Sequence, residues 1–494
     1  MQTQAKVVIG LDVGTTGTKA AVCDPMGRVL GKAYCEYDLH FTDDGGVEQN
    51  AADWIGAVRT VVRDAVAASG VPAEGIAAIS LSTQGGSFWA RGENGEALTP
   101  VMTWMDGRAR AEAADLRMLA GEKLYRASGW QVGAGFDAAK LLWLRRNAPE
   151  VFDKAVSFDT TLETVNRYLT GRNVTDPTNA AIRILYNIEE QRYDPEILEL
   201  LGLDESRLPE VLPTGAVIGN LTATAAEELG LPQDVAVCNG AHDQYCASLG
   251  AGAVHAGDVL VATGTAWVVL GVTDRLIRSE SHVSPGIHPV AGLYGAMASL
   301  VSAGSVLKWY KNLVGSDYSE LDAGALTHRE SAKDLFFAPY LAGAGFPHRN
   351  PDEPAKMIGL KLAHDRYDIA RALMEGVAFE VRRVLEEYSR LGCPAEKLTM
   401  TGRTAHSALW RGILRDVTGC GIAVTEEADT CCIGAAMLAA VGAGLYRDLS
   451  DAAANMARVT LFDTPDADGV AFYNEKYCRY RKATDNGCGK SEGE

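Results

Sequence analysis

The sequence predicts an α/β protein whose chain forms two related domains. Short apolar strands alternate with helical segments along most of its 494 residues. A unit of strand, glycine-threonine tip and strand occurs near the N-terminus and again past the middle, with tips at Gly14-Thr15 and Gly264-Thr265. Polar loops follow several strands, which is where α/β proteins usually bind ligands. The internal repeat predicts two related domains that face each other.

The first unit begins with the apolar run 7–11 and ends with a second short strand at 20–23. Its tip carries a carboxylate, glycines, threonines and a lysine. Threonine hydroxyls and bare amides suit phosphate oxygens, and glycine lets a ligand approach the backbone. Asp12 cannot bind phosphate itself, but it can hold a Mg²⁺ ion that bridges phosphates. An ordinary glycine turn explains the same residues, so the phosphate interpretation depends on the second unit.

Composition excludes several classes of partner. The formal net charge of −18 argues against nucleic acid or an anionic membrane as the main partner. Asp12 interrupts the early apolar run, and the apolar stretch 433–445 is too short to span a bilayer, so neither a secretory signal nor a membrane span is predicted. The 10 cysteines include no C-x-x-C pair and the 9 histidines show no metal-ligand spacing. Reduced thiols in a cytoplasmic protein are expected.

Two loops in the first half have the composition of a ligand site. A helix over 58–68 and a strand over 76–81 lead into a polar loop that contains Gln84. A later strand leads to Trp104, Asp106 and Arg108, where a ring can pack on the C–H faces of a polyhydroxylated ligand and charged groups can bind its hydroxyls. The alternatives are a plain glycine turn for the first loop and a surface ion pair between Asp106 and Arg108 for the second.

Asp243 is a candidate for a catalytic group. Helices are expected over 108–119 and 137–146, a strand and then a helix within 153–170, a helix over 222–229, and a strand over 235–238. That last strand leads to Asp243, which precedes a short helix of small residues. A carboxylate between a strand and a helix is a typical catalytic placement. Aspartate is also a good helix N-cap, and the two roles are compatible. His242 is interpreted as structural.

The second half repeats the pattern around the strand, tip and strand of 259–270. Gly304 and Lys308 lie on one face of a helix expected over 303–313. The remaining expected elements are a strand at 294–298, a long helix at 369–391, a strand at 398–401 that leads into Gly402, and helices at 407–419 and 430–445. Neither a P-loop nor a dinucleotide-binding fingerprint is present. We predict domains at 1–252 and 253–450 and a C-terminal extension at 451–494, with about the last ten residues disordered.

Six motifs, in this order, resemble those of the FGGY carbohydrate kinases over residues 6–450. The motifs are Asp12-x-Gly14-Thr15-Thr16-x-x-Lys19, Trp104-x-Asp106-Gly107-Arg108, Asp243 after Cys238-Asn239-Gly240, Thr263-Gly264-Thr265, Pro339-Tyr340-Leu341 with Pro347-His348-x-Asn350-Pro351, and Glu375-Gly376. The segment Phe136-x-x-x-Lys140-Leu141-Leu142-Trp143 is similar to xylulokinases in particular. The resemblance implies the sugar kinase/actin/Hsp70-like ATPase fold, which is ribonuclease H-like, with a ligand cleft between the domains.

The resemblance also implies a role for each candidate residue. Asp243 would be the general base that deprotonates a substrate hydroxyl as it attacks the γ-phosphoryl group of ATP. Asp12 would orient Mg²⁺. The residues that would bind ATP are Gly14, Thr15, Thr16, Lys19, Gly264, Thr265, Gly304, Lys308 and Gly402. The residues that would face the sugar are Gln84, Trp104, Asp106, Asp243 and Gln244.

Three departures from the family pattern concern the substrate and the nucleotide. Xylulokinases usually have Met-His at Thr83-Gln84, and Gln244 follows the base as in glycerol kinases. Gly402-Arg403-Thr404 replaces a triple glycine near the adenosine. We expect a cytoplasmic ATP-dependent kinase of a small sugar or polyol, a pentulose such as xylulose first, with ribulose, erythritol or glycerol as alternatives; a homodimer is compatible with the sequence. A non-catalytic sugar or nucleotide sensor on the same scaffold is the rival from another class.

Overall fold

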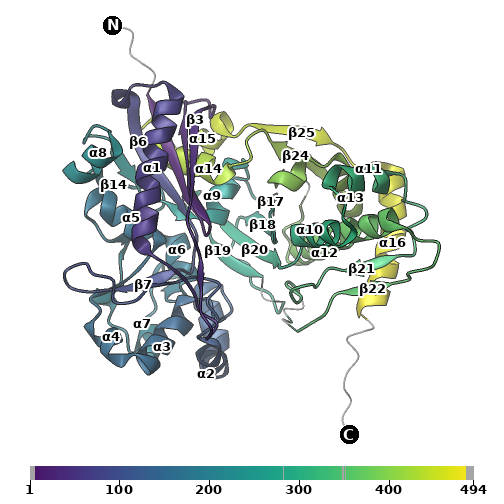
Figure 1. Cartoon of the computed structure of the whole chain (residues 1–494), viewed down its shortest axis with the longest axis horizontal. Helices are drawn as coiled ribbons and strands as arrows, with labels where there is room; N and C mark the ends of the chain where they lie inside the picture. The colour runs from purple at the N-terminus through teal and green to yellow at the C-terminus, as the bar shows by residue number, and fades with distance from the viewer. Residues whose placement is uncertain (1–5, 282, 348–349, 351, 396, 486–494) are drawn as a thin grey trace.

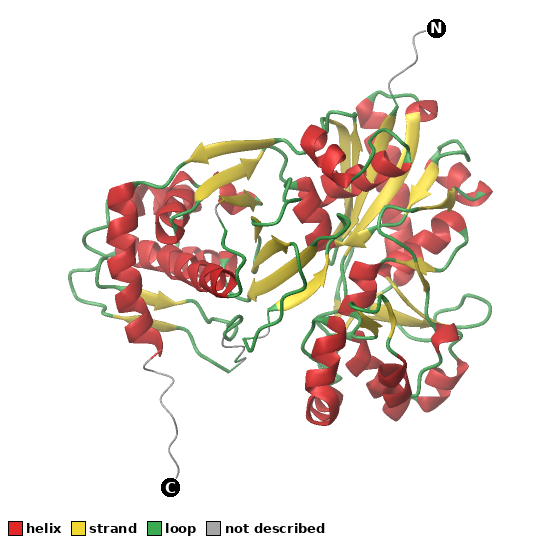
Figure 2. Ribbon diagram, turned by 180° about the vertical axis from the view of Figure 1, so that it is seen from behind, coloured by secondary structure: helices red, strands yellow, loops and turns green. Residues whose placement is uncertain are grey.

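Two α/β halves make up the structure, a computed structural model that describes residues 6–485 except 282, 348–349, 351 and 396. Figure 1 shows the N-terminal half, coloured purple to teal, beside the green-to-yellow C-terminal half. Figure 2, seen from behind, shows helices packed around the strands of both halves. The predicted α/β class is therefore confirmed.

The central sheet of the N-terminal half brings two polar loops to one edge. Its order is β14-β15-β6-β1-β2-β3, and β16 also pairs with β6. The strands are β1 (Val7–Val13), β2 (Gly17–Cys23), β3 (Val29–Glu36), β6 (Ile76–Thr83), β14 (Val217–Asn220), β15 (Ala236–Cys238) and β16 (Ala241–His242). β1 and β2 form the predicted antiparallel hairpin, whereas β6 runs parallel to β1 and ends beside it, with Val13 opposite Thr83. The loops that follow β1 and β6 therefore lie next to each other.

The central sheet of the C-terminal half repeats this topology. Its order is β19-β20-β18-β17-β23-β24-β25. The strands are β17 (Asp258–Thr263), β18 (Trp267–Thr273), β19 (Ser284–Ile287), β20 (Tyr294–Leu300), β23 (Lys397–Thr401), β24 (Gly421–Thr425) and β25 (Val459–Asp463). β17 and β18 are antiparallel, and β23 runs parallel to β17. The order β20-β18-β17-β23-β24 thus corresponds to β3-β2-β1-β6-β15, which confirms the internal repeat.

Two helices that occupy equivalent places in the repeat each pack on the sheet of the other half. α14 (Thr430–Gly442) packs on the N-terminal sheet, where Ala436 joins Val8 in one core cluster. α9 (Asp243–Gly250) packs on the C-terminal sheet, where Tyr245 joins Leu260. Small residues allow the close approach, since a Cβ on Gly434 would lie 1.9 Å from the carbonyl oxygen of Cys246 in α9. Because each helix packs on the sheet of the other half, the start of α9 is held between the two sheets.

The other helices cover the sheets or build a side lobe. α1 (Ala51–Ser69), α5 (Thr161–Thr170) and α8 (Ala223–Leu229) flank the N-terminal sheet, and α1 begins where the Asn50 side chain accepts from the Ala52 amide. The lobe contains a five-stranded sheet and helices packed around one apolar cluster. Its elements are β4 (His40–Phe41), β5 (Val47–Gln49), β7 (Phe88–Arg91), β8 (Val101–Met102), β9 (Ser157–Thr160), α2 (Arg110–Ser128), α3 (Asp137–Asn147), α4 (Pro149–Lys154), α6 (Pro177–Ile182) and α7 (Pro195–Leu201).

The C-terminal half has a core that includes the end of the described chain. Its helices are α10 (Gly304–Val314), α11 (Tyr318–Leu326), α12 (Arg366–Arg390), α13 (Ala408–Thr418) and α16 (Ala467–Asp485), whereas α15 (Leu449–Met456) packs with α14 against the N-terminal sheet. Short two-stranded ladders complete the structure: β10 (Val174–Thr175) with β13 (Glu210–Val211), β11 (Tyr186–Asn187) with β12 (Arg192–Tyr193), and β21 (Phe336–Ala338) with β22 (Lys356–Ile358). None of the helices in the described part of the chain has the length and apolar character needed to cross a bilayer.

The packing cuts across the predicted division into 1–252, 253–450 and 451–494. α14 and α15 share a core cluster with the N-terminal sheet. β25 pairs with β24, and α16 contributes three tyrosines to the C-terminal core. Residues 451–485 are therefore part of both cores rather than an appendage. The disorder predicted for the end of the chain falls on residues 486–494, which lie outside the described residues.

Candidate active site

Two carboxylates meet where the polar loops of the N-terminal sheet converge. The strand register places Asp12 of β1 opposite Ser82 of β6, and Ser82 opposite Ala241 of β16. Asp243 follows β16 directly and is the first residue of α9. The Ser82 hydroxyl donates a 2.8 Å hydrogen bond to Asp12. Adjacent parallel strands thus bring Asp12 and Asp243 to one edge of the sheet.

Electrostatics reflects the closeness of the two acids. Burial raises the pKa of Asp12 to about 6; the hydrogen bond from Ser82 opposes this shift, and the negative charge of Asp243 adds to it. A carboxylate with a raised pKa beside a second acid is a typical feature of a catalytic or metal-binding site. The same pair would be stabilised by a divalent cation.

Asp243 is not the N-cap of α9, which was the alternative interpretation of its position. The N-cap of α9 is His242, whose side chain makes no capping hydrogen bond. The Asp243 side chain is 30% exposed, and its Oδ1 lies 3.3 Å from Nε2 of His242. Cys431 at the start of α14 donates to the backbone oxygen of Asp243 over 3.5 Å. Asp243 therefore has a backbone held by the neighbouring helix and a carboxylate open to solvent.

Each glycine-threonine tip is closed by a hydrogen bond from its glycine amide, across three residues in the first tip and two in the second. The Gly14 amide donates to the Gly17 carbonyl over 3.0 Å, and the Gly264 amide donates to the Ala266 carbonyl over 3.1 Å. Gly264 and Thr265 are exposed, as is Thr16 on the first tip, and Gly14 and Thr15 are half-buried. Both tips thus present backbone and hydroxyl groups to solvent.

Three predicted nucleotide residues lie around the second tip. A Cβ on Gly304 would lie 2.1 Å from the carbonyl oxygen of Gly264. Gly402 has a φ of +87°, and a Cβ there would lie 2.3 Å from the carbonyl oxygen of Thr263. Both positions therefore require glycine. Lys308 is exposed one turn after Gly304 on α10.

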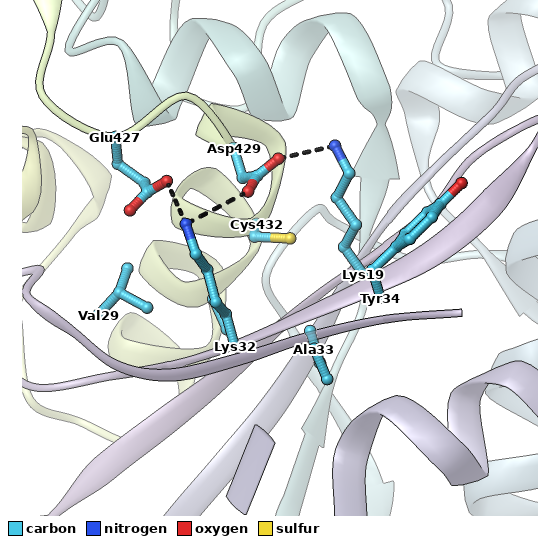
Figure 3. A pocket seen from close by; sticks show the side chains of 10 residues that line it. Lys19, Val29, Lys32, Ala33, Tyr34, Glu427, Asp429 and Cys432 are labelled. Carbon is cyan, nitrogen blue, oxygen red and sulfur yellow. Dashed lines mark hydrogen bonds and ion pairs between the residues drawn. The ribbon is translucent and has the colours of Figure 1, made fainter. Parts of the chain in front are cut away.

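Lys19 forms an ion pair with Asp429, the residue that precedes α14. Its Nζ lies 2.7 Å from Asp429, beside a cavity of about 260 Å³ that Lys32 and Glu427 also line (Figure 3). Burial alone would lower the pKa of Lys19, but the hydrogen bond and charge of Asp429 outweigh it and raise that pKa. A phosphate would have to compete with Asp429 for this ammonium group.

The predicted sugar residues connect to the first tip. The Gln84 amide nitrogen donates to Gln49 over 3.1 Å, and Gln49 donates to the Thr15 carbonyl over 2.6 Å. The indole of Trp104, half exposed, donates to the Thr15 hydroxyl over 2.9 Å. Oε1 of Gln84 and Oε1 of Gln244 are buried and accept no hydrogen bond within the described residues. Buried acceptors without donors suit the hydroxyl groups of a ligand.

Asp106 forms an ion pair that is buried, where the alternative interpretation expected a surface pair. It accepts from Arg108 over 2.6 Å and from the Val47 amide over 3.1 Å, and it is 1% exposed. Arg108 also lies 2.8 Å from Glu48 and covers the ring of Trp143. The Asp106 carboxylate is therefore occupied by Arg108, and a ligand would meet the pair as a unit.

Sequence reasoning missed several residues that support the site. Ser82 lies two residues before Gln84, and the parallel register of β1 and β6 places its hydroxyl beside Asp12. Gln49 and Asp429 come from distant segments and carry no local signal. Within the recognised motifs, Glu375 pairs with Arg371 over 2.9 Å inside the C-terminal core and serves packing. The motif positions His348 and Pro351 lie outside the described residues.

Comparisons with known proteins agree with this architecture. Residues 7–250 match the N-terminal domain, and residues 259–443 the C-terminal domain, of the FGGY family of carbohydrate kinases. The chain is 26% identical to a xylulose kinase of Staphylococcus epidermidis over 96% of both chains. It is 27% identical to a gluconokinase of Bacillus subtilis over 94% of this chain and 93% of that one. The crystal structure of ligand-bound xylulose kinase from Lactobacillus acidophilus superimposes with a TM-score of 0.92 at 25% identity, covering 97% of this chain and 98% of that one.

The matched domains span the two halves that carry Asp12, Asp243 and both tips, so fold and site lead to one assignment. The fold is the two-domain ATPase fold related to actin and Hsp70, and the enzyme is a phosphotransferase that uses ATP. The chain belongs to the FGGY family of carbohydrate kinases.

Proposed function

We propose that this kinase phosphorylates a hydroxyl group of a small, neutral, open-chain sugar, a pentulose such as xylulose first. The observation that carries the proposal is the convergence of Asp243, Asp12 and the Thr15 tip with Gln84 and Trp104 at one sheet edge. This arrangement places the partly exposed Asp243 carboxylate beside both the proposed phosphate-binding turn and a set of groups that suit hydroxyls.

Asp243 acts as general base in this proposal. Its carboxylate accepts the proton of the sugar hydroxyl while that oxygen bonds to the γ-phosphorus and the bond from phosphorus to the bridging oxygen of ADP breaks. Phosphoryl transfer depends mainly on positioning and charge neutralisation. Amides and hydroxyls of Gly14, Thr15 and Thr16 bind the terminal phosphates from one side, and Gly264 and Thr265 bind them from the other. Gly304, Lys308 and Gly402 border the nucleotide.

Asp12 fits a role as the Mg²⁺ residue, directly or through water. Burial, which raises its pKa, disfavours its negative charge, and a bound cation would offset that cost. Oxygen donors are the ligands that Mg²⁺ prefers. When bound, Mg²⁺ would neutralise the charge of the phosphates.

Charge around the sugar residues favours a neutral substrate over a sugar acid. Arg108 is occupied by Asp106 and Glu48. Lys140 is fully buried and donates to three backbone carbonyls. A carboxylate of the kind that gluconate carries would need a cation that is available. The amides Gln84 and Gln244 instead suit hydroxyl groups, and Trp104 offers its ring to a carbon chain.

The support for the sensor hypothesis is Gly402-Arg403-Thr404, because a bulky arginine there could shrink the nucleotide pocket or weaken ATP use. Arg403 is exposed at the start of the 3₁₀ turn that runs from Arg403 to His406, so packing does not fix its side chain over Gly402. This supports ATP use. Ribulose, erythritol and glycerol remain alternatives within the kinase proposal.

A coupled assay of ADP release tests the function. The panel contains D-xylulose, D-ribulose, erythritol, glycerol, D-gluconate and a control without acceptor, each with Mg²⁺ and ATP. We expect the highest kcat/KM with D-xylulose and release near the no-acceptor control with D-gluconate. Fastest turnover of D-gluconate would contradict the neutral-substrate proposal. Sugar binding without ADP release from any acceptor would favour the sensor.

A further inference from the structure

A buried lysine lies directly beneath the proposed sugar residues. Lys140 of α3 is 0% exposed, and its Nζ donates to the carbonyls of Gly86 over 2.5 Å, Met102 over 3.0 Å and Thr103 over 3.2 Å. An ammonium group has three hydrogens, so all of its donors are used. Asp137, the nearest carboxylate, lies 3.9 Å away and pairs with Arg183 over 2.8 Å. The ammonium charge is therefore solvated by backbone carbonyls of two loops.

Two of the three carbonyls belong to the loops that carry the sugar residues, and the third is that of Met102 at the end of β8. Gly86 is two residues after Gln84, and Thr103 directly precedes Trp104. The Trp104 amide also donates to Ser87 over 3.2 Å, and the Trp104 indole reaches Thr15. Lys140 thus connects the loop after β6 to the loop after β8, and both to the first phosphate tip.

Burying an ammonium group costs free energy, because the group loses its contacts with water. Desolvation lowers the pKa of Lys140 to about 8, although the charge of Asp137 partly offsets the effect. An apolar side chain of similar length would avoid this cost but would remove the Lys140 donor from all three carbonyls, of which that of Thr103 would keep the Asp106 amide at 3.0 Å. Their loops would then move apart or admit water, and Gln84 and Trp104 would move with them.

We propose that Lys140 is a positioning residue that sets the distance between Gln84 and Trp104, and so determines how tightly the enzyme binds its sugar. It touches neither sugar nor ATP. The inference rests on the proposed function of the same site, since it concerns the acceptor rather than the nucleotide.

The test compares Lys140→Met with Lys476→Met in the full-length enzyme. Lys476 is a matched control because its Nζ is equally buried and donates to the Ala332 carbonyl over 2.7 Å, but it lies in the C-terminal core and pairs with Glu375. KM and kcat are measured for D-xylulose and for ATP, with thermal melting recorded for each variant. We expect Lys140→Met to raise the KM for D-xylulose at least about tenfold and to leave the KM for ATP within about threefold.

The control separates positioning from general destabilisation. Lys476→Met should lower the melting temperature while the KM for D-xylulose stays within about twofold of wild type. A folded Lys140→Met enzyme with an unchanged KM for D-xylulose overturns the inference. If Lys140→Met does not fold, Lys140→Gln, which keeps two of the donors, is judged by the same limits. Wild-type enzyme that phosphorylates no acceptor in the panel contradicts the proposed function instead, which keeps the two failures distinct.

Discussion

The indole nitrogen of Trp104 donates a 2.9 Å hydrogen bond to the hydroxyl of Thr15. The two residues lie in different loops, one proposed for the sugar and the other for the terminal phosphates. The bond therefore links the loop proposed for the sugar directly to the loop proposed for the phosphates, with no substrate group between them.

This coupling is measurable by a double-mutant cycle of Trp104→Phe and Thr15→Val, read on kcat/KM for D-xylulose. Each variant removes one partner and keeps most of the volume, so we expect an interaction energy of about 0.5 to 1 kcal/mol. The control cycle replaces Thr15→Val by Thr16→Val, the next residue on the tip, and should show additive effects. Equal interaction energies in the two cycles would mean that the bond has no role in turnover.

The ion pair between Lys19 and Asp429 predicts competition with ATP. If Lys19 must leave the carboxylate to reach a phosphate, Asp429→Asn should lower the KM for ATP by about two- to fivefold, the range expected of a partly exposed ion pair. Lys19→Met should raise it. Lys32→Met removes the other lysine of the same cavity, which lies 3.9 Å from the same carboxylate, and should change the KM for ATP far less than Lys19→Met. A higher KM in Asp429→Asn would show that this carboxylate assists the nucleotide.

The raised pKa of Asp12 predicts a conflict between stability and function. A carboxyl group whose pKa is higher in the folded protein than in the unfolded chain stabilises the fold only when protonated, and this contribution is lost as the pH rises through about 6. Asp12→Asn should therefore stabilise the protein at pH 7.5 by about 1 to 3 kcal/mol while reducing turnover.

The gain in stability should shrink as the pH falls from 7 towards 4, because the wild-type carboxyl is then protonated as well. Thermal melting of both proteins across this range, without nucleotide, checks the prediction. A difference that is constant with pH would assign the effect to packing around Ser82 instead of to the charge of Asp12.

Periodicity predicted the framework of the fold because each strand or helix carries its own apolar pattern. The hairpin of β1 and β2 and the second one of β17 and β18 were both predicted, as were α1, α12 and α14. The extent to which residues 451–485 pack into the cores was not predicted. α16 presents Tyr473, Tyr477 and Tyr480 to the C-terminal core at helical spacing, but charged residues between them give the segment a polar average.

Site geometry was predictable only where it follows from strand ends. Asp12, Gln84 and Asp243 all end or follow parallel strands, so their convergence could be expected. The bonds from Gln49 and Trp104 to Thr15, and the pairing of Lys19 with Asp429, join segments separated by up to 410 residues. The pairing of Lys19 with Asp429 depends on the packing of α14 on the N-terminal sheet, and the bonds to Thr15 depend on how loops distant in sequence meet, which no local pattern reveals.

The central claim is that Asp243 deprotonates the acceptor hydroxyl, and the Asp243→Asn enzyme tests it most directly. Its rate of ADP release with D-xylulose is measured beside wild type and Asp429→Asn, and D-xylulose binding is measured by calorimetry. We predict a fall in kcat of at least about a hundredfold with sugar affinity nearly intact, the loss expected when a general base is removed. Turnover close to wild type would contradict the account and exclude Asp243 from the chemistry.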